Sequence, residues 1–189
     1  MQKDIGERIR RMREAQALTR EQVSRLSGLA PERLAAFEEG SAVPSIGVVI
    51  KLSRVLGSRM EGIILGREDA VPNAPTLTLH RGARPTGYEY GETEQGYTFR
   101  TLTRPGTPGH QMEPFLLTFA TGTTEAKPIT HEGQEFVYVL EGTIELTYDD
   151  ERVMLSPGDS AYLESSHPHL FRGVGDSPAR MLAVVSSGG

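Results

Sequence analysis

Three histidines and one glutamate in the second half of the chain are the residues whose types and spacing point to chemistry. His131 and Glu135 are four positions apart, so an extended backbone turns both side chains to the same face. His167 and His169 are two positions apart and share a face by the same rule. Imidazole and carboxylate groups that converge on a rigid β scaffold suit a divalent first-row metal. The sequence therefore predicts a metal site of His131, Glu135 and His169, with His167 near its rim.

The elements that must position these residues have the pattern of a β protein. A run of β-branched and aromatic residues, 136–140, ends at the turn pair Glu141-Gly142, and a second such run follows at once. Many short strands at regular spacing predict a sandwich or a barrel. An edge strand is also expected within residues 81–95, which are rich in Gly, Pro and Tyr. The expected strands are Tyr97–Thr103, Glu113–Ala120, Glu135–Leu140, Thr143–Tyr148, Arg152–Leu155, Ser160–Leu163, His169–Arg172 and Arg180–Val185.

The first 66 residues have the apolar spacing of helices. Ile5 and Ile9 are four positions apart and begin the apolar stripe of a first helix. Thr19 and Gln22 have the types and spacing of a capping box, which predicts the start of a second helix. Three further helices are expected from Pro31 to Gly40, from Pro44 to Gly57 and from Arg59 to Leu65. We therefore expect a five-helix unit before the β region.

Charge and composition narrow the classes of function. The net charge of −5 over 189 residues divides into +3 for residues 1–66 and −8 for residues 67–189, so only the first part is expected to meet a polyanion. The chain has no cysteine, which excludes disulfides, thiolate metal sites and a cysteine nucleophile and fits the cytoplasm. No apolar run approaches the roughly 18 residues of a membrane span. The N-terminal residues lack the pattern of a signal peptide.

The second and third helices, joined by a short turn, form a helix-turn-helix pattern. The text that carries a resemblance is Ile5-Gly-Glu-Arg-Ile-Arg-Arg, Leu18-Thr-Arg-Glu-Gln22, Ser27-Gly-Leu, Phe37-Glu-Glu-Gly40, Pro44-Ser45 and Leu52-Ser-Arg-Val-Leu-Gly57. With it, residues 5–66 resemble the Xre family of lambdoid-repressor-type DNA-binding domains. The resemblance implies that Arg20 and Gln22 lie near a phosphate. It also implies that Pro31, Glu32, Arg33 and Ala36 lie on the groove face of the third helix.

The third helix departs from that family in its charge. Glu32, Glu38 and Glu39 outnumber Arg33, and carboxylates near phosphates are unfavourable. An alternative in which the helical domain serves only packing or dimerisation therefore stays open beside DNA binding.

Residues 97–186 resemble a cupin, a small jelly-roll barrel. The first motif is His131, three residues, Glu135, six residues and Gly142, and the second is Leu155-Ser-Pro-Gly-Asp-Ser-Ala-Tyr162 followed by Pro168-His169. Two positions depart from the cupin pattern, because Ile129 stands where the first histidine is expected and Gly173 where an asparagine is usual. The remaining set of two histidines and one carboxylate suits Fe, Zn, Mn or Ni. The alternative is a polar cluster that binds an organic ligand without a metal.

Together the two resemblances cover nearly the whole chain and are those of the Xre–cupin bacterial transcriptional regulators. The expected fold class is two domains, α then β, with a five-helix lambda-repressor-like helix-turn-helix bundle followed by an all-β cupin jelly-roll barrel. The expected boundaries are residues 1–66 for the DNA-binding domain, 67–80 for a linker and 81–189 for the cupin sensor. The residues expected to line the ligand pocket are Phe99, His110, Glu113, Phe115, Tyr138, Tyr162 and His167.

The regulator resemblance implies a double-stranded DNA operator, a small-molecule effector, and a homodimer whose cupin barrels pair through sheet edges. The competing hypothesis is an enzyme. Mononuclear non-haem iron epoxidases that act on hydroxypropylphosphonate share the two-part layout and the spacing of His131 and Glu135. By that resemblance His131, Glu135 and His169 would ligate iron, and the helix-turn-helix would be vestigial. A cupin isomerase without redox chemistry is a third alternative.

Overall fold

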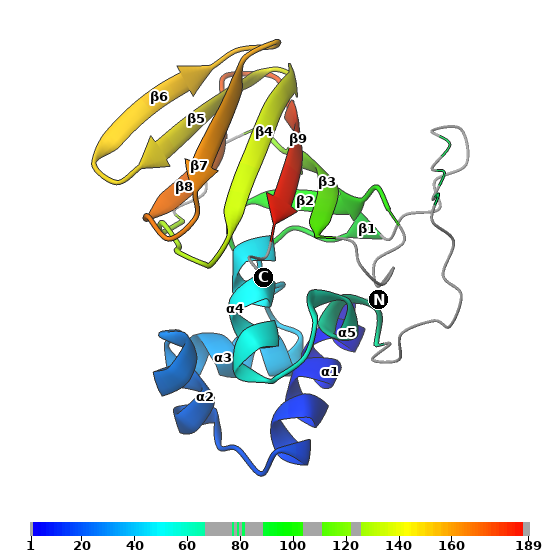
Figure 1. Cartoon of the computed structure of the whole chain (residues 1–189). Helices are drawn as coiled ribbons and strands as arrows, with labels where there is room; N and C mark the ends of the chain where they lie inside the picture. The colour runs from blue at the N-terminus through cyan, green and yellow to red at the C-terminus, as the bar shows by residue number, and fades with distance from the viewer. Residues whose placement is uncertain are drawn as a thin grey trace.

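The chain forms a helical domain followed by a β domain in the computed structural model, which describes residues 2–66, 89–103, 111–121 and 126–186 and positions 77, 79 and 81 (Figure 1). The helices are α1 (Gln2–Ala15), α2 (Arg20–Ser27), α3 (Pro31–Glu39), α4 (Ile46–Val55) and α5 (Met60–Leu65). The prediction of five helices before the β region is confirmed. The linker expected at 67–80 lies almost entirely outside the described residues.

Local signals in the sequence account for the ends of α2 and α3. The Thr19 hydroxyl accepts a hydrogen bond from the Gln22 amide at 3.2 Å, and the Gln22 side-chain oxygen accepts one from the Thr19 amide at 2.7 Å. This is the predicted capping box, which satisfies two of the amides left free at a helix start. Pro31 occupies the first turn of α3, where no amide hydrogen is needed. Gly40 ends α3 with a φ of 73°, a conformation that glycine adopts without strain.

The β domain consists of two antiparallel sheets. Their strands are β1 (Glu89–Tyr90), β2 (Tyr97–Thr101), β3 (Met112–Phe119), β4 (Gln134–Glu141), β5 (Thr143–Tyr148), β6 (Glu151–Leu155), β7 (Ser160–Glu164), β8 (His169–Val174) and β9 (Ala179–Ser186). The larger sheet has the order β1-β2-β3-β9-β4-β7, and the smaller sheet has the order β6-β5-β8. All eight predicted strands are present with ends shifted by at most two residues, and β1 is the expected edge strand.

The two sheets bury their facing side chains in one core. Phe99, Phe119 and Val137 from the larger sheet are almost fully buried, as are Ile144 and Leu146 from the smaller one. Burial alternates along the strands, which is the pattern of a sheet with one face inside and one outside. The predicted jelly-roll architecture of the second domain is therefore confirmed.

The helical domain rests on the β domain through α4 and its flanks (Figure 1). The Ile46 amide donates to the Tyr97 hydroxyl at 3.1 Å, and the Glu94 amide donates to the Val43 carbonyl at 3.1 Å. The Tyr90 hydroxyl donates to the Ile64 carbonyl at 3.0 Å, so strands β1 and β2 and the turn between them all contact the helices. Within the described residues, no helix is long and apolar enough to cross a membrane.

Candidate functional site

His131, Glu135 and His169 converge at the end of the barrel that α4 covers, as the spacing predicted. One ligating atom from each residue lies within 4.8 Å of the others. His131 Nε2 is 3.2 Å from Glu135 Oε1, and His169 Nε2 is 3.9 Å from Glu135 Oε2. Only 0%, 8% and 4% of the side chains of His131, Glu135 and His169 are exposed. We call these three residues the triad.

Backbone contacts orient both imidazoles of the triad. His131 Nδ1 is 2.9 Å from the Glu132 carbonyl oxygen, and His169 Nδ1 is 2.9 Å from the His167 carbonyl oxygen. A carbonyl oxygen only accepts, so each Nδ1 carries the hydrogen and each Nε2 turns its lone pair toward Glu135. This arrangement is typical of histidines that ligate a metal through Nε2.

The chemistry of the triad fits a divalent cation. Within the described residues His131 Nε2 is buried without a hydrogen-bond partner, because its contact with Glu135 lacks hydrogen-bond geometry. A buried nitrogen without a hydrogen-bond partner is unfavourable, and a bound ion would satisfy it. Burial lowers the pKa of His169, and this outweighs the opposite effect of Glu135, so the neutral form that binds metals is favoured. Two imidazole nitrogens and one carboxylate oxygen are a donor set for a divalent first-row metal.

Both departures from the cupin motif lie at contacts with neighbouring strands. Ile129 forms an antiparallel bridge with His169, which brings the segment before β4 beside β8 and His131 beside His169. Ile129 itself lines the cavity next to the triad, so the protein offers three ligands there. A Cβ atom on Gly173 would lie 2.6 Å from the Cβ of Phe119, so an asparagine does not fit at this position.

The wall opposite the triad comes from the helical domain. A cavity of about 20 Å³ lies between α4 and the barrel, which is room for one water molecule or ion. Ile46 and Gly47 of α4 line it together with Gln95, Tyr97 and the triad residues Glu135 and His169. Sequence reasoning missed the contribution of α4, because no local pattern signals a contact between domains.

Two of the predicted pocket residues lie on the wrong side of the barrel wall. Tyr138 and Tyr162 are 39% and 66% exposed on the outer face of the larger sheet. Alternation along β4 is the reason: Glu135 points inward, so residues 137 and 139 also point inward and Tyr138 points outward. Tyr162 pairs with Phe136 on that outer face. The prediction that these tyrosines line the pocket is therefore wrong.

The other predicted pocket residues are spread over three environments. Phe99, Phe115 and Glu113 are buried in the barrel but do not line the cavity beside the triad. His167 is half-exposed, with its Nδ1 2.8 Å from Asp149 Oδ2 and its ring stacked on Tyr148, so it does not reach the triad. His110 lies outside the described residues.

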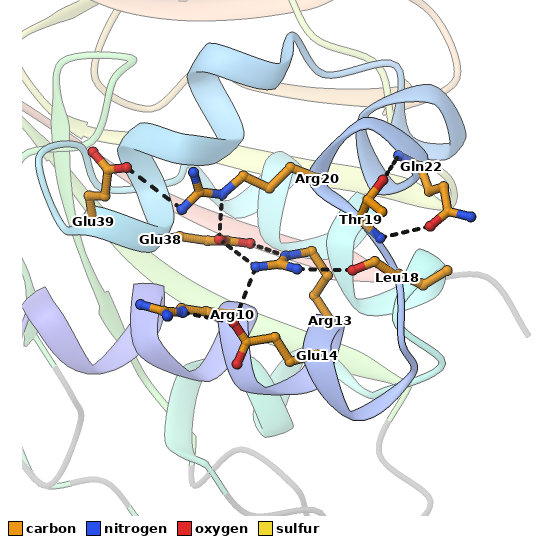
Figure 2. Close-up of polar contacts among 9 residues, drawn as sticks. All are labelled: Arg10, Arg13, Glu14, Leu18, Thr19, Arg20, Gln22, Glu38 and Glu39. Atoms are coloured by element: carbon orange, nitrogen blue, oxygen red, sulfur yellow. Dashed lines mark hydrogen bonds and ion pairs between the residues drawn. The ribbon is translucent and has the colours of Figure 1, made fainter.

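The predicted acidic face of α3 is less acidic than the sequence indicated, because Glu38 points into the helical domain (Figure 2). Arg13 donates to both carboxylate oxygens of Glu38 at 2.6 and 3.0 Å, and Arg20 donates to Oε2 at 2.8 Å. None of the Glu38 side chain is exposed. Burial alone would raise the pKa of Glu38, but the hydrogen bonds from Arg13 and Arg20 outweigh it and the pKa is lowered.

The residues predicted to meet DNA are not equally available. Gln22, Pro31 and Glu32 are exposed at the starts of α2 and α3, and Ala36 is partly exposed. The Arg20 guanidinium forms an ion pair with Glu38 and lies 3.6 Å from the Glu39 carboxylate. Arg33 Nη2 donates to Glu94 Oε1 of the β domain at 2.6 Å, and 32% of the Arg33 side chain is exposed.

Comparison with known protein families agrees with this division of the chain. Residues 9–63 match the helix-turn-helix family, and residues 115–185 match the cupin domain family. The HTH-type transcriptional regulator PuuR of Escherichia coli (strain K12) is 27% identical over 179 residues, which are 95% of this chain and 92% of PuuR. PuuR of Shigella flexneri matches equally well.

Two kinds of solved structure share the whole fold. An HTH_3 family transcriptional regulator from Vibrio cholerae superposes over 98% of this chain and 96% of its own, with a TM-score of 0.65 and 17% identity. Hydroxypropylphosphonic acid epoxidase from S. wedmorenis superposes over 97% of both chains, with a TM-score of 0.51 and 21% identity. At these sequence identities the structural similarity establishes the two-domain fold. The activity has to be inferred from the residues of the site.

Proposed function

The chain is an Xre-type helix-turn-helix protein with a C-terminal cupin domain, and on this premise we propose that it is a sequence-specific DNA-binding transcriptional regulator of the cytoplasm. In this proposal the cupin domain senses a small-molecule effector. The observation that carries the proposal is the similarity to an HTH-type transcriptional regulator across both domains, over 95% of this chain.

The exposed ends of α2 and α3 are suited to a DNA groove. In helix-turn-helix proteins the first residues of the recognition helix contact base edges. Here that part of α3 presents Pro31 and Glu32, and Gln22 lies exposed at the start of α2. A glutamate accepts hydrogen bonds from cytosine, so an exposed Glu32 is compatible with base reading. The inward turn of Glu38 removes one of the carboxylates that would repel phosphates.

We place the effector and a divalent ion, Fe, Zn, Mn or Ni, at the triad. His131 Nε2, His169 Nε2 and a carboxylate oxygen of Glu135 would hold the ion. A bound ion offers further coordination positions to oxygen or nitrogen atoms of an effector. All three side chains are buried, which limits their movement.

A homodimer through the cupin is part of the proposal, because helix-turn-helix proteins commonly bind two half-sites as dimers. The interface proposed here is the outer face of the larger sheet instead of the sheet edges that the resemblance implied. Phe136, Tyr138, Leu140 and Tyr162 are exposed there to 37%, 39%, 41% and 66%. The strand register adds Val184, which lies opposite Phe136. A contiguous apolar face of this kind is typical of a protein interface.

Glutamate at both Phe136 and Tyr138 is expected to convert the dimer to a monomer, because buried, unpaired carboxylates oppose association at an apolar interface. Sedimentation velocity measures the change in mass. Val153→Glu on β6 is the control, since Val153 is also exposed, at 44%, but lies on the other sheet. A doubly substituted chain that stays dimeric would place the interface elsewhere.

The experiment that tests the proposed function is a footprint of the full chain on the DNA upstream of its own gene. The dimer is expected to protect two half-sites whose centres lie about 10 base pairs apart, or about 34 Å. Protection of one continuous, sequence-independent stretch, or no protection at low salt, would contradict the proposal.

The triad favours one second candidate, an iron-dependent oxygenase. Two histidines and a carboxylate on one side of a metal leave positions for substrate and oxygen. Oxygen consumption by the Fe(II)-loaded chain separates the candidates. Uptake that depends on an added small organic substrate would favour the enzyme, and uptake that does not respond to substrates favours the regulator.

A further inference from the structure

The first turn of α4 closes the cavity that Glu135 and His169 of the triad line. A Cβ atom on Gly47 would lie 2.2 Å from Ile129 Cδ1 and 2.7 Å from His131 Cδ2, so the α4 backbone touches the triad directly. Glycine costs about 1 kcal/mol in a helix relative to alanine. Its presence in α4 is explained by this close approach.

The space that α4 leaves is smaller than an organic effector. The cavity of about 20 Å³ holds one water molecule or ion, whereas ligand pockets of proteins measure about 300–1,000 Å³. Gly47 and Ile46 form its wall on the side of the helical domain. An organic molecule therefore reaches the triad only when α4 moves away from the barrel.

A single residue of the β domain connects α4 with α3. Glu94 lies in the turn between β1 and β2, and its Oε1 accepts hydrogen bonds from Arg33 Nη2 at 2.6 Å and from the Ser45 amide at 3.3 Å. The Glu94 amide in turn donates to the Val43 carbonyl at 3.1 Å. Glu94 is thus hydrogen-bonded both to Arg33, the only arginine of α3, and to the residue that precedes α4.

We propose that the helix-turn-helix domain is the lid of the cupin cavity, and that Glu94 holds the lid in a closed form with low affinity for DNA. In the closed form Arg33 is paired with Glu94 and is unavailable to a base or phosphate. An organic effector and the closed form exclude each other, because both need the space beside Gly47. Binding of the effector therefore shifts the population to an open form with a free Arg33. The inference deepens the proposed function and rests on it for its DNA-binding part.

Distances between two spin labels test the lid. The chain has no cysteine, so Leu26→Cys on α2 and Met154→Cys on β6, at side chains that are 64% and 55% exposed, give one pair of labels per protomer. Mixing with an excess of unlabelled chain suppresses the distances between protomers of the dimer. Electron–electron double resonance should give one narrow distance distribution for the full chain. Glu94→Gln and Gly47→Val are each expected to broaden it and to add longer distances.

The two variants open the lid by different means. Glu94→Gln weakens the hold on Arg33 with little change in size, and Glu92→Gln is its control, because Glu92 is exposed in the same turn. Gly47→Val places methyl groups where Ile129 and His131 lie, and valine is no worse than glycine inside a helix. An unchanged distribution in both folded variants would overturn the lid.

Affinity for the protected upstream DNA tests the low-affinity closed form. Fluorescence anisotropy is expected to show about 10-fold tighter binding for Glu94→Gln than for Glu92→Gln, because an apparent affinity scales with the competent fraction. Arg33→Ala in the Glu94→Gln background should remove this gain. Open variants with unchanged or weaker binding would overturn the low-affinity assignment. If no variant binds DNA, the proposed function fails, while the spin-label distances still decide whether α4 is a lid.

Discussion

Replacing Glu38 by glutamine is expected to lower the free energy of unfolding of the helical domain by about 3 kcal/mol. The carboxylate is completely buried and accepts three hydrogen bonds from the guanidinium groups of Arg13 and Arg20. Glutamine has the same shape but removes the buried charge that both arginines share, and only the longer contacts of Arg13 with Glu14 at 3.5 Å and of Arg20 with Glu39 at 3.6 Å remain. Removal of one partner from a buried ion pair costs about 3–5 kcal/mol, and the lower end applies because 35% of Arg20 is still exposed.

Urea unfolding followed by circular dichroism measures the effect, and Glu39→Gln is the matched control. Glu39 is the next residue on α3, but 62% of its side chain is exposed and its contact with Arg20 is 3.6 Å. An exposed pair of this kind contributes at most about 1 kcal/mol. Equal stability of the two variants would show that Glu38 does not stabilise the bundle.

The Glu38 carboxylate also makes the helical domain sensitive to acid. The pKa of Glu38 is lowered in the folded state, so its contribution to stability is complete above the ordinary glutamate pKa of about 4.3. The contribution is lost as the pH falls from there through the lowered pKa. Glu38→Gln should therefore lose less stability than the unsubstituted chain over this acid range.

Alanine at His131 or at Glu135 is expected to weaken the binding of Co(II) or Zn(II) by more than about 100-fold. Loss of residues that merely support metal ligands already costs 10–100-fold, and these side chains are the proposed ligands themselves. Both are buried and their ligating atoms face each other, so no solvent-exposed group replaces them. Isothermal titration calorimetry gives the affinity, and the visible spectrum of the Co(II) form reports the coordination.

His167→Ala is the control for the metal experiment. His167 is the histidine nearest to the triad in sequence, but it pairs with Asp149 on the surface and 52% of its side chain is exposed. Its removal should leave the affinity for Co(II) unchanged. Loss of affinity in all variants alike would indicate a surface site, and retention of affinity in His131→Ala would exclude the triad.

Local patterns predicted most of the fold and the triad. The capping box of Thr19 and Gln22 and the alternation of β4 depend only on residues close in sequence. Both features could therefore be predicted from the sequence. Two of the errors concern the direction of side chains, which the spacing along the element encodes. Tyr138 is three positions from the inward Glu135 and so points outward, and Glu38 is four positions from the buried Leu34 and shares its face.

The contact between the domains could not be predicted from the sequence. Gly47 and Glu94 become neighbours of the triad and of Arg33 only where the helices pack against the β domain. The spacing of residues within α4 or within the turn between β1 and β2 does not encode that packing. The lid is therefore a property of the assembled chain.

The specificity ratio for DNA tests the central claim most directly. Fluorescence anisotropy at about 0.15 M salt compares the full chain on its protected upstream fragment with a shuffled fragment of the same length and composition. A regulator is expected to bind its own fragment about 1,000-fold more tightly or better. Affinity should also fall steeply as salt is raised, because phosphate contacts release counterions. Equal affinity for the two fragments would contradict the account.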